Sequence, residues 1–200
     1  RFLLNEGSDI IDKDGRKFRE CSNVKILITN PEKDISSPIE KISDSKGWLY
    51  PRIDEIANIT LARKHIPGHI YVYGQRIFNY NQAVNQIDEF VIPLLRKDER
   101  TRRAVISLWN PEVDSNIFNK EVPSIMVVKF HIKSEYLETT AVIRSNDIFF
   151  GFPANLYQIF LLKEYVSQRL GKKNGSITLN LLSAHAFEER FNDMKEMISR

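Results

Sequence analysis

The chain has 200 residues, 42% apolar and 28% charged, a composition that suits one globular domain, residues 1–200, with a substantial core. Its 29 basic and 26 acidic residues leave a net charge of +3, which predicts no general nucleic-acid-binding surface but permits a local anion site. With no apolar run of transmembrane length, no signal-peptide pattern and a single cysteine, Cys21, we expect a cytoplasmic protein with no membrane partner and no internal disulfide.

The first half of the chain is expected to alternate short regular elements with loops. Val24, Ile26 and Ile28 alternate with other residues as in a strand, whereas Pro31 and Pro38 lie in a polar stretch typical of a loop. We predict a helix end at 1–5 closed by Gly7, a turn at 12–16, a strand at 24–28, a loop at 30–46, a helix at 52–64, a short strand at 70–76 broken at Gly74, and an amphipathic helix at 82–95.

The second half contains the clearest alternation of apolar and polar residues. Val128, Phe130 and Ile132 share one face of a predicted strand, and a second strand returns to deliver Arg144 at its end. We predict strands at 104–109, 127–133, 137–143 and 176–183, and helices at 155–170, stopped by Gly171, and at 187–198.

A cation, a hydroxyl and a carboxylate are gathered where the second hairpin strand ends. Arg144, Ser145 and Asp147 follow an apolar run, and arginine supplies a rigid fork of donors that suits phosphate. A serine beside it can add another hydrogen bond. These residues alone fit either a phosphate site or an ordinary strand end with a salt bridge.

Further motifs extend this pattern along the chain. They are Tyr73-Gly74, Arg102-Arg103, Trp109-Asn110, Arg144-Ser145-x-Asp147, Gly151-x-Pro153-x-Asn155 and Ser183-Ala184-His185-Ala186-Phe187. In this order and spacing they resemble the thymidylate synthase family, from about Tyr71 to Glu189. The resemblance implies an α/β (α+β) fold, a mixed sheet flanked by helices, and a homodimer that forms through sheet faces.

The resemblance also implies a set of nucleotide-binding residues. Arg144 and Ser145 would bind the phosphate, helped by Arg102 and Arg103 from the partner subunit. Asn155 would contact the pyrimidine edge, where the family has asparagine for uracil and aspartate for cytosine. His185 would contact the ribose and Asp147 would assist folate binding. An early-loop arginine would also reach the phosphate, and Arg16 fits that position best, with Arg19 as its rival.

Two further residues match catalytic positions of the family. Tyr73 would act in the proton-transfer network, and Glu55 would occupy the place of a catalytic glutamate on a helix. Structural alternatives stand beside each assignment: a buried tyrosine hydroxyl needs a partner in any case, and Glu55 also fits an exposed helix position. Arg16, Arg102 and Arg103 equally fit solvated charges. No metal site is predicted.

Serine stands where the family carries its nucleophilic cysteine. The family thiolate adds to C6 of the pyrimidine, so that C5 can attack a one-carbon unit carried by folate. Counting back from Arg144, the matching residue is Ser124, followed by Ile125, and a serine without an adjacent base is a weak nucleophile. Either an engineered change disarmed the site, or a natural member lost or altered the reaction; the shortened middle and early chain end favour the second.

The sequence therefore predicts a thymidylate synthase-like protein that binds a uracil-type pyrimidine 5′-monophosphate such as dUMP. Whether it is an active transferase of the methyltransferase kind is left open, and methylenetetrahydrofolate is a cofactor only by resemblance. The alternatives are a catalytically inactive nucleotide-sensing or partner-binding subunit, an enzyme of altered chemistry on the same nucleotide, and a structural protein that retains only the fold.

Overall fold

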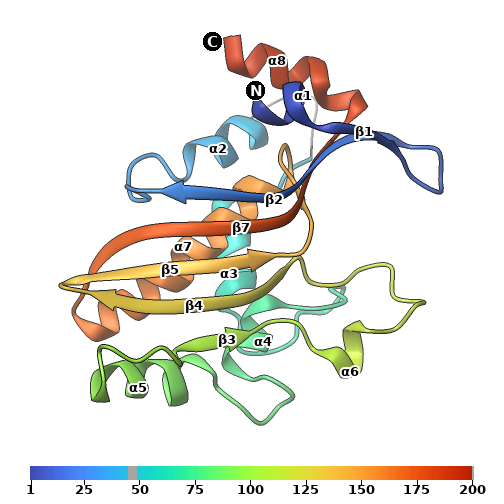
Figure 1. Ribbon diagram of the computed structural model, residues 1–200. Coiled ribbons are helices and arrows are strands. Elements are labelled where there is room, and N and C mark those ends of the chain that lie inside the picture. Colours follow the sequence, from blue (N-terminus) through green and yellow to red (C-terminus); the bar gives the residue numbers. More distant parts are fainter. Residues whose placement is uncertain (45–48, 200) are drawn as a thin grey trace.

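A mixed sheet organises the computed structural model, which describes residues 1–44 and 49–199. The sheet order is β1-β2-β7-β5-β4-β3, and a two-residue strand, β6, also pairs with β7 (Figure 1). Neighbours are antiparallel except for β5 and β6, which run parallel to β7. The strands are β1 Ser8–Ile11, β2 Lys17–Ile28, β3 Val105–Ser107, β4 Ile125–Lys133, β5 Tyr136–Ile143, β6 Asn146–Asp147 and β7 Lys173–Phe187.

Helices flank this sheet, which confirms the expected α/β architecture. The longest helix, α7, runs from Gly151 to Leu170, crosses one face of the sheet, and packs against α3. None of the described helices is long and apolar enough to cross a membrane. The others are α1 Phe2–Glu6, α2 Ser37–Ser43, α3 Ile53–Leu61, α4 Tyr73–Phe78, the π-helix η1 Ile87–Val91, α5 Ile92–Lys97, α6 Pro111–Asp114, the 3-10 helix η2 Glu188–Arg190 and α8 Phe191–Ser199.

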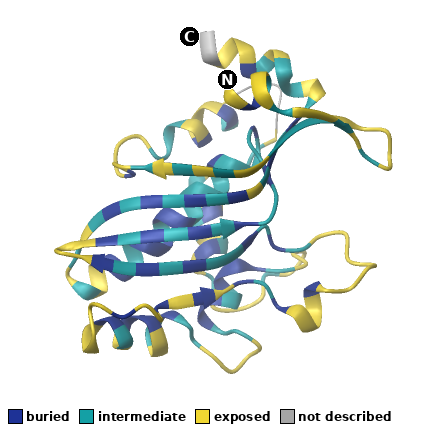
Figure 2. Ribbon diagram, viewed as in Figure 1, coloured by how far each residue is buried: buried dark blue, intermediate teal, exposed yellow. Residues whose placement is uncertain are grey.

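The core lies on the face of the sheet that α7 covers. Successive strand residues point to opposite faces, so β4, β5 and β7 each bury every second side chain (Figure 2). Phe130, Ile143 and Leu179 are fully buried there. On the other face of the sheet Leu27 and Leu182 are exposed, and no described helix lies in front of it (Figure 1).

Two segments differ in type from the sequence prediction. The predicted loop at 30–46 contains α2, whose Pro38 occupies the first turn, where a missing N–H costs no helical hydrogen bond; positions 45–46 of that range lie outside the described residues. The predicted strand at 70–76 is wrong, because α4 begins at Tyr73. Gly74 packs against α3: a Cβ there would lie 2.4 Å from the Ala62 carbonyl oxygen.

Other predictions hold with moved boundaries. The helix expected at 82–95 begins only at Ile87, because Asn81 and Gln82 adopt positive φ angles in a turn before it. The long helix begins at Gly151 rather than residue 155, and the last strand covers Lys173–Phe187 rather than 176–183. The hairpin strands and the left-handed stop at Gly171 are confirmed.

A lysine is buried inside the fold, far along α7 from its start. Lys163 is fully buried, and its Nζ donates a hydrogen bond to the Gly175 carbonyl oxygen in β7. Burial lowers the pKa of Lys163 to about 8, although the nearby carboxylates of Glu138 and Glu32 oppose the shift. The folded chain therefore binds fewer protons than the unfolded chain between about pH 8 and the ordinary lysine value of 10.5.

We expect the free energy of unfolding to rise across that pH window, by on the order of 3 kcal/mol, because the buried amine becomes neutral. Urea unfolding at several pH values measures the slope, which Lys163→Met should remove. Lys133→Met, at an exposed end of β4, is the matched control and should keep the slope. A slope that survives in Lys163→Met would contradict the assignment.

Candidate functional site

The polar residues after β5 lie beside the end of β7. Because β5 and β6 run parallel to β7, Asn146 and Asp147 pair with Ala184 and His185. The Ser145 Oγ lies 3.4 Å from Nδ1 of His185. The structure thus brings together Arg144, Ser145, Asp147 and His185, which the sequence had separated by some forty positions.

Arg144 has an unused guanidinium. Its backbone N–H donates to the Ser124 carbonyl oxygen at 2.8 Å, which fixes the start of β4 next to the end of β5. The side chain is half-buried, and its buried Nε has no hydrogen-bond partner among the described residues. A buried donor left without a partner is costly, so this position favours an anionic ligand that would satisfy it.

Tyr73 holds the backbone at Ser124. Its hydroxyl oxygen accepts the N–H groups of Ser124 at 3.0 Å and Ile125 at 3.1 Å, and its ring packs edge-on against Tyr71. Burial raises the pKa of Tyr73 strongly, so its hydroxyl stays protonated near neutral pH. Tyr73 therefore positions Ser124. No described side chain forms a hydrogen bond with the Ser124 hydroxyl that would activate it.

A second amide joins Asn155 at the start of α7. The Asn155 Nδ2 donates to the Oδ1 of Asn146 at 3.3 Å, and Asn146 is buried with its own Nδ2 unpaired among the described residues. Sequence reasoning missed Asn146, although it lies inside the Arg-Ser-Asn-Asp run. A buried asparagine with a spare donor is the signal, and burial cannot be read from so short a polar stretch.

The two early arginines take different places. Arg16 is exposed, and its guanidinium carbon lies 3.2 Å from the centre of the Phe187 ring. It forms an ion pair with Glu189, and its positive charge lowers the pKa of His185. Arg19 points elsewhere, because its guanidinium pairs with Asp9 at 2.7 Å and with a backbone carbonyl of α1. The geometry thus favours Arg16 over its rival as a member of this cluster.

Three other predicted residues make no hydrogen bond or ion pair with this group among the described residues. Glu55 is exposed and caps α3, since its carboxylate accepts the Arg52 backbone N–H at 2.8 Å. Arg102 and Arg103 are exposed before β3, and their side chains form no hydrogen bond or ion pair within the part of the chain that the structure describes. Their assigned roles stay predictions.

His185 is neutral over most of the physiological pH range. Its pKa lies below the ordinary value, chiefly because the ring is desolvated by burial, and the charges of Arg16 and Arg144 act in the same direction. Asp147 and Glu20 oppose them. A neutral imidazole can both donate and accept, as contact with a hydroxyl requires.

Comparisons with known proteins identify the family. A family model described as thymidylate synthase matches residues 54–200. The chain belongs to the thymidylate synthase family. It is 32% identical to the "Putative thymidylate synthase" of Methanococcoides burtonii over 196 residues, covering 98% of this chain and 86% of that protein.

Two more relatives support the family. The protein of the same name from Methanosarcina mazei is 34% identical, with the same coverage of both chains. Thymidylate synthase 1 of Bacillus spizizenii is 28% identical over 137 residues, 66% of this chain and 48% of that protein. The predicted resemblance is therefore confirmed at the level of the family.

We expect Arg144→Gln to raise the pKa of His185, because the change removes a positive charge that disfavours the imidazolium. The pKa should stay below the ordinary histidine value, since burial is its largest cause. Histidine ring signals followed by NMR across pH 4–8 (roughly the histidine range) measure it. Arg96→Gln, whose side chain contacts the end of α7, is the charge-matched control, and an equal shift there would contradict the proximity.

Proposed function

We propose that this member of the thymidylate synthase family binds a uracil-type pyrimidine 5′-monophosphate. The observation that carries the proposal is the guanidinium of Arg144, which has no partner among the described residues and stands in a cluster with Ser145 and His185. A phosphate would accept hydrogen bonds from Arg144 and Ser145, and Arg16 adds positive charge on the β2 side. The neutral imidazole of His185 suits a sugar hydroxyl.

The base would be recognised by amides rather than by charge. The Oδ1 of Asn155 is left to accept the N3–H of uracil, because its Nδ2 already donates to Asn146. The spare Nδ2 of Asn146 lies in the same group and suits a carbonyl acceptor. Cytosine has no N3–H, so its N3 acceptor would face the Oδ1 acceptor of Asn155 without a hydrogen between them.

The family reaction at C5 of the base is the less supported half of the proposal. Ser124 stands at the nucleophile position, Tyr73 fixes its backbone, and the Ser124 hydroxyl has no base in hydrogen-bond contact within the described part of the chain. A protonated alcohol adds to C6 far less readily than a thiolate. The second candidate function, a catalytically inactive nucleotide-sensing or partner-binding subunit, is favoured by this observation.

At Asp147, one carboxylate oxygen remains to accept a hydrogen bond from the folate that the family uses. One carboxylate oxygen, Oδ1, accepts the backbone N–H groups of Phe149 at 2.8 Å and Phe150 at 3.3 Å. The other, Oδ2, has no hydrogen-bond partner in the described residues, so it fits a single donor of a methylenetetrahydrofolate. When bound, that folate would supply the one-carbon unit. Cytoplasmic localisation and a single domain also remain predictions.

We expect dUMP to bind more tightly than dCMP, because only uracil presents a donor to Asn155. Calorimetry with both nucleotides measures the preference. Arg144→Gln should weaken dUMP binding about ten- to a hundredfold, the cost of one charge-assisted hydrogen bond. Arg96→Gln is the control and should bind normally. Equal affinity for dUMP and dCMP, or no effect of Arg144→Gln, would refute this reading of the site.

We propose that the open face of the sheet forms a homodimer. Leu27, Leu182 and Val105 are exposed on or near that face, and burying apolar side chains is the main source of association energy. In such a dimer Arg102 and Arg103 of one subunit would reach the phosphate of the other, which fits their exposed position and their lack of partners within the described part of one chain.

Mixing two defective variants tests that arrangement. A chain with Arg102→Ala and Arg103→Ala is combined with one carrying Arg144→Gln, and half of the sites in a mixed dimer should then lose both functions while the other half regain both. We expect dUMP binding to reappear in the mixture. If the mixture binds no more than its parents although light scattering shows dimers, the arginines do not act across the interface.

We expect the unmodified chain to release no measurable tritium from C5-labelled dUMP, because Ser124 cannot form the C6 adduct at a useful rate. Ser124→Cys restores a thiol at a backbone already held by Tyr73, and should show thiol-dependent chemistry on 5-bromo-dUMP but make no thymidylate from dUMP and methylenetetrahydrofolate. Ser124→Ala is the control for altered packing. Robust thymidylate formation by the unmodified chain would refute the assignment of Ser124.

A further inference from the structure

The turn between β1 and β2 holds the backbone of Arg16 at a fixed place. Asp12 closes this turn, because its Oδ1 accepts the backbone N–H groups of Asp14 at 2.9 Å and of Arg16 at 2.8 Å. The backbone N–H of Asp12 donates to the Arg16 carbonyl oxygen at 3.0 Å, and Gly15 supplies a positive φ angle of 81° between them. The turn therefore fixes the backbone of Arg16 independently of its side-chain contacts.

The ring of Phe187 sets the plane of the Arg16 guanidinium. The guanidinium carbon lies 3.2 Å from the centre of that ring, as when a planar cation stacks on an aromatic face. Two neighbours hold the ring edge-on: its centroid lies 5.9 Å from that of Phe18 and 5.3 Å from that of His185. Phe187 follows His185 by two residues in β7, so both side chains lie on the same face of the sheet. The stack therefore keeps the cation on the side of the sheet that carries His185.

Glu189 occupies one edge of the same guanidinium and leaves the other. A guanidinium has two edges with two donor groups each, and either edge can hold a carboxylate or a phosphate. The Oε1 of Glu189 accepts from Nε of Arg16 at 3.0 Å and also from Nη2. Within the described residues Nη1 donates no hydrogen bond, so the edge at the tip of Arg16 can hold a second anion.

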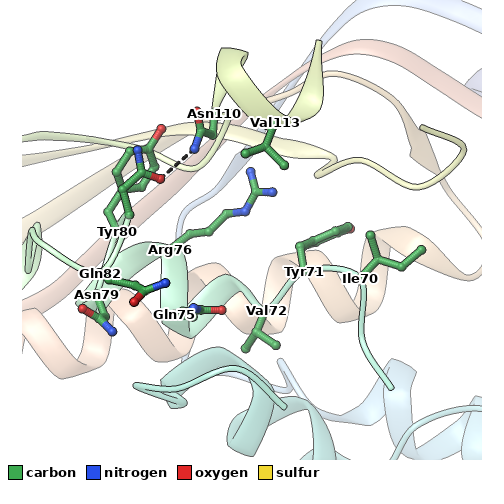
Figure 3. A pocket seen from close by; sticks show the side chains of 11 residues that line it. Ile70, Tyr71, Val72, Gln75, Arg76, Asn79, Tyr80, Gln82, Asn110 and Val113 are labelled. Carbon is green, nitrogen blue, oxygen red and sulfur yellow. Dashed lines mark hydrogen bonds between the residues drawn. The ribbon is translucent and has the colours of Figure 1, made fainter. Parts of the chain in front are cut away.

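Arg76 shows the opposite arrangement, with its tip fully occupied. In Figure 3 it extends from α4 towards Val113. Its Nη2 donates to the Asp114 carboxylate at 2.8 Å, and its Nη1 donates to the Leu108 carbonyl oxygen at 2.8 Å. Its side chain is only 13% exposed, whereas that of Arg16 is 50% exposed. Arg76 therefore serves the fold, while Arg16 is held from behind with its tip towards solvent.

We propose that Phe187 and Glu189 are positioning residues that hold Arg16 ready for the phosphate of a nucleotide. This role rests on the proposed function, in which Arg144 binds the same phosphate. Phe187 fixes the plane of the Arg16 guanidinium, and Glu189 fixes its rotation within that plane, so the open edge keeps one direction. An arginine without these two contacts would lose side-chain freedom on binding, which weakens affinity by about two- to tenfold.

The charge of Glu189 makes the direction of the effect informative. A carboxylate close to a bound phosphate repels it, so the loss of this charge alone would tighten nucleotide binding. Loss of a positioned Arg16 would weaken binding instead. A weakening therefore indicates positioning. The adjoining Glu188, whose carboxylate lies 3.9 Å from the amine of Lys17, offers a variant with the same loss of charge.

Titrations with dUMP and with deoxyuridine, followed through backbone amide NMR signals, test the proposal. The affinity ratio is defined as the affinity for dUMP divided by that for deoxyuridine, because only dUMP carries the phosphate. We expect Glu189→Ala and Phe187→Leu each to lower the affinity ratio about three- to tenfold. Phe187→Tyr keeps the aromatic face and Glu188→Ala keeps Glu189, so both should hold the affinity ratio within about twofold.

The Nε–H signal of Arg16 gives a readout without any nucleotide. We expect hydrogen exchange at this group to be at least about fivefold faster in Glu189→Ala than in the unmodified chain, because the acceptor of its hydrogen bond is removed. An unchanged exchange rate would overturn the proposal. So would an affinity ratio that Glu189→Ala leaves unchanged or raises, or an equal loss in Glu188→Ala.

Phe187→Leu separates positioning from damage to the sugar site. If it weakens dUMP and deoxyuridine equally, Phe187 acts through His185 and not through Arg16, and the proposal is wrong. If dUMP does not bind to the unmodified chain, the proposed function fails and this role of Phe187 and Glu189 fails with it. If dUMP binds and the affinity ratio does not respond to either variant, only the positioning role fails.

Discussion

The parallel pairing of β5 and β6 with β7 is the constraint on which the rest of the structure depends. Parallel neighbours need a long crossover, and α7 supplies it while covering the core face. Parallel strands also end at the same edge, so the residues after Ile143 lie beside the end of β7. Arg144 and His185 meet for this reason, as ligand sites commonly do where parallel strands end.

The antiparallel β4–β5 hairpin brings Ser124 to the same edge of the sheet. Because β4 runs opposite to β5, its first residue pairs with the last residue of β5, and Ser124 is joined to Arg144 through the backbone. Tyr73 reaches the same point from α4, whose close approach to α3 requires Gly74. The motif Tyr73-Gly74 thus combines a hydrogen-bonding group with the glycine that allows its placement.

Regular periodicity and family resemblance predicted most of the fold, and packing decided the rest. The alternation from Val128 to Ile132 survives in the structure because one face of that strand is buried throughout. The segment before Gly74 is a short apolar run that predicted a strand, yet it forms none, since the contact of Gly74 with Ala62 is a tertiary effect that no local pattern records. The sequence did not predict Asn146 as a site residue for the same reason, because its burial comes from elements distant in sequence.

The candidate site was predictable in composition but not in electrostatics. Arg144, Ser145 and His185 are visible as motifs, whereas the neutral state of His185 arises from burial and from the charges of Arg16, just before β2, and Arg144, just after β5. Likewise the strong upward shift of the Tyr73 pKa follows from its burial and excludes it as a base at neutral pH. Proton removal at this edge would thus fall to another group, and Ser124 has none in contact within the described chain. The proposed binding role and the proposed nucleophile can therefore be tested separately, because Arg144, Ser145 and His185 lie together while no described side chain contacts the Ser124 hydroxyl as a base.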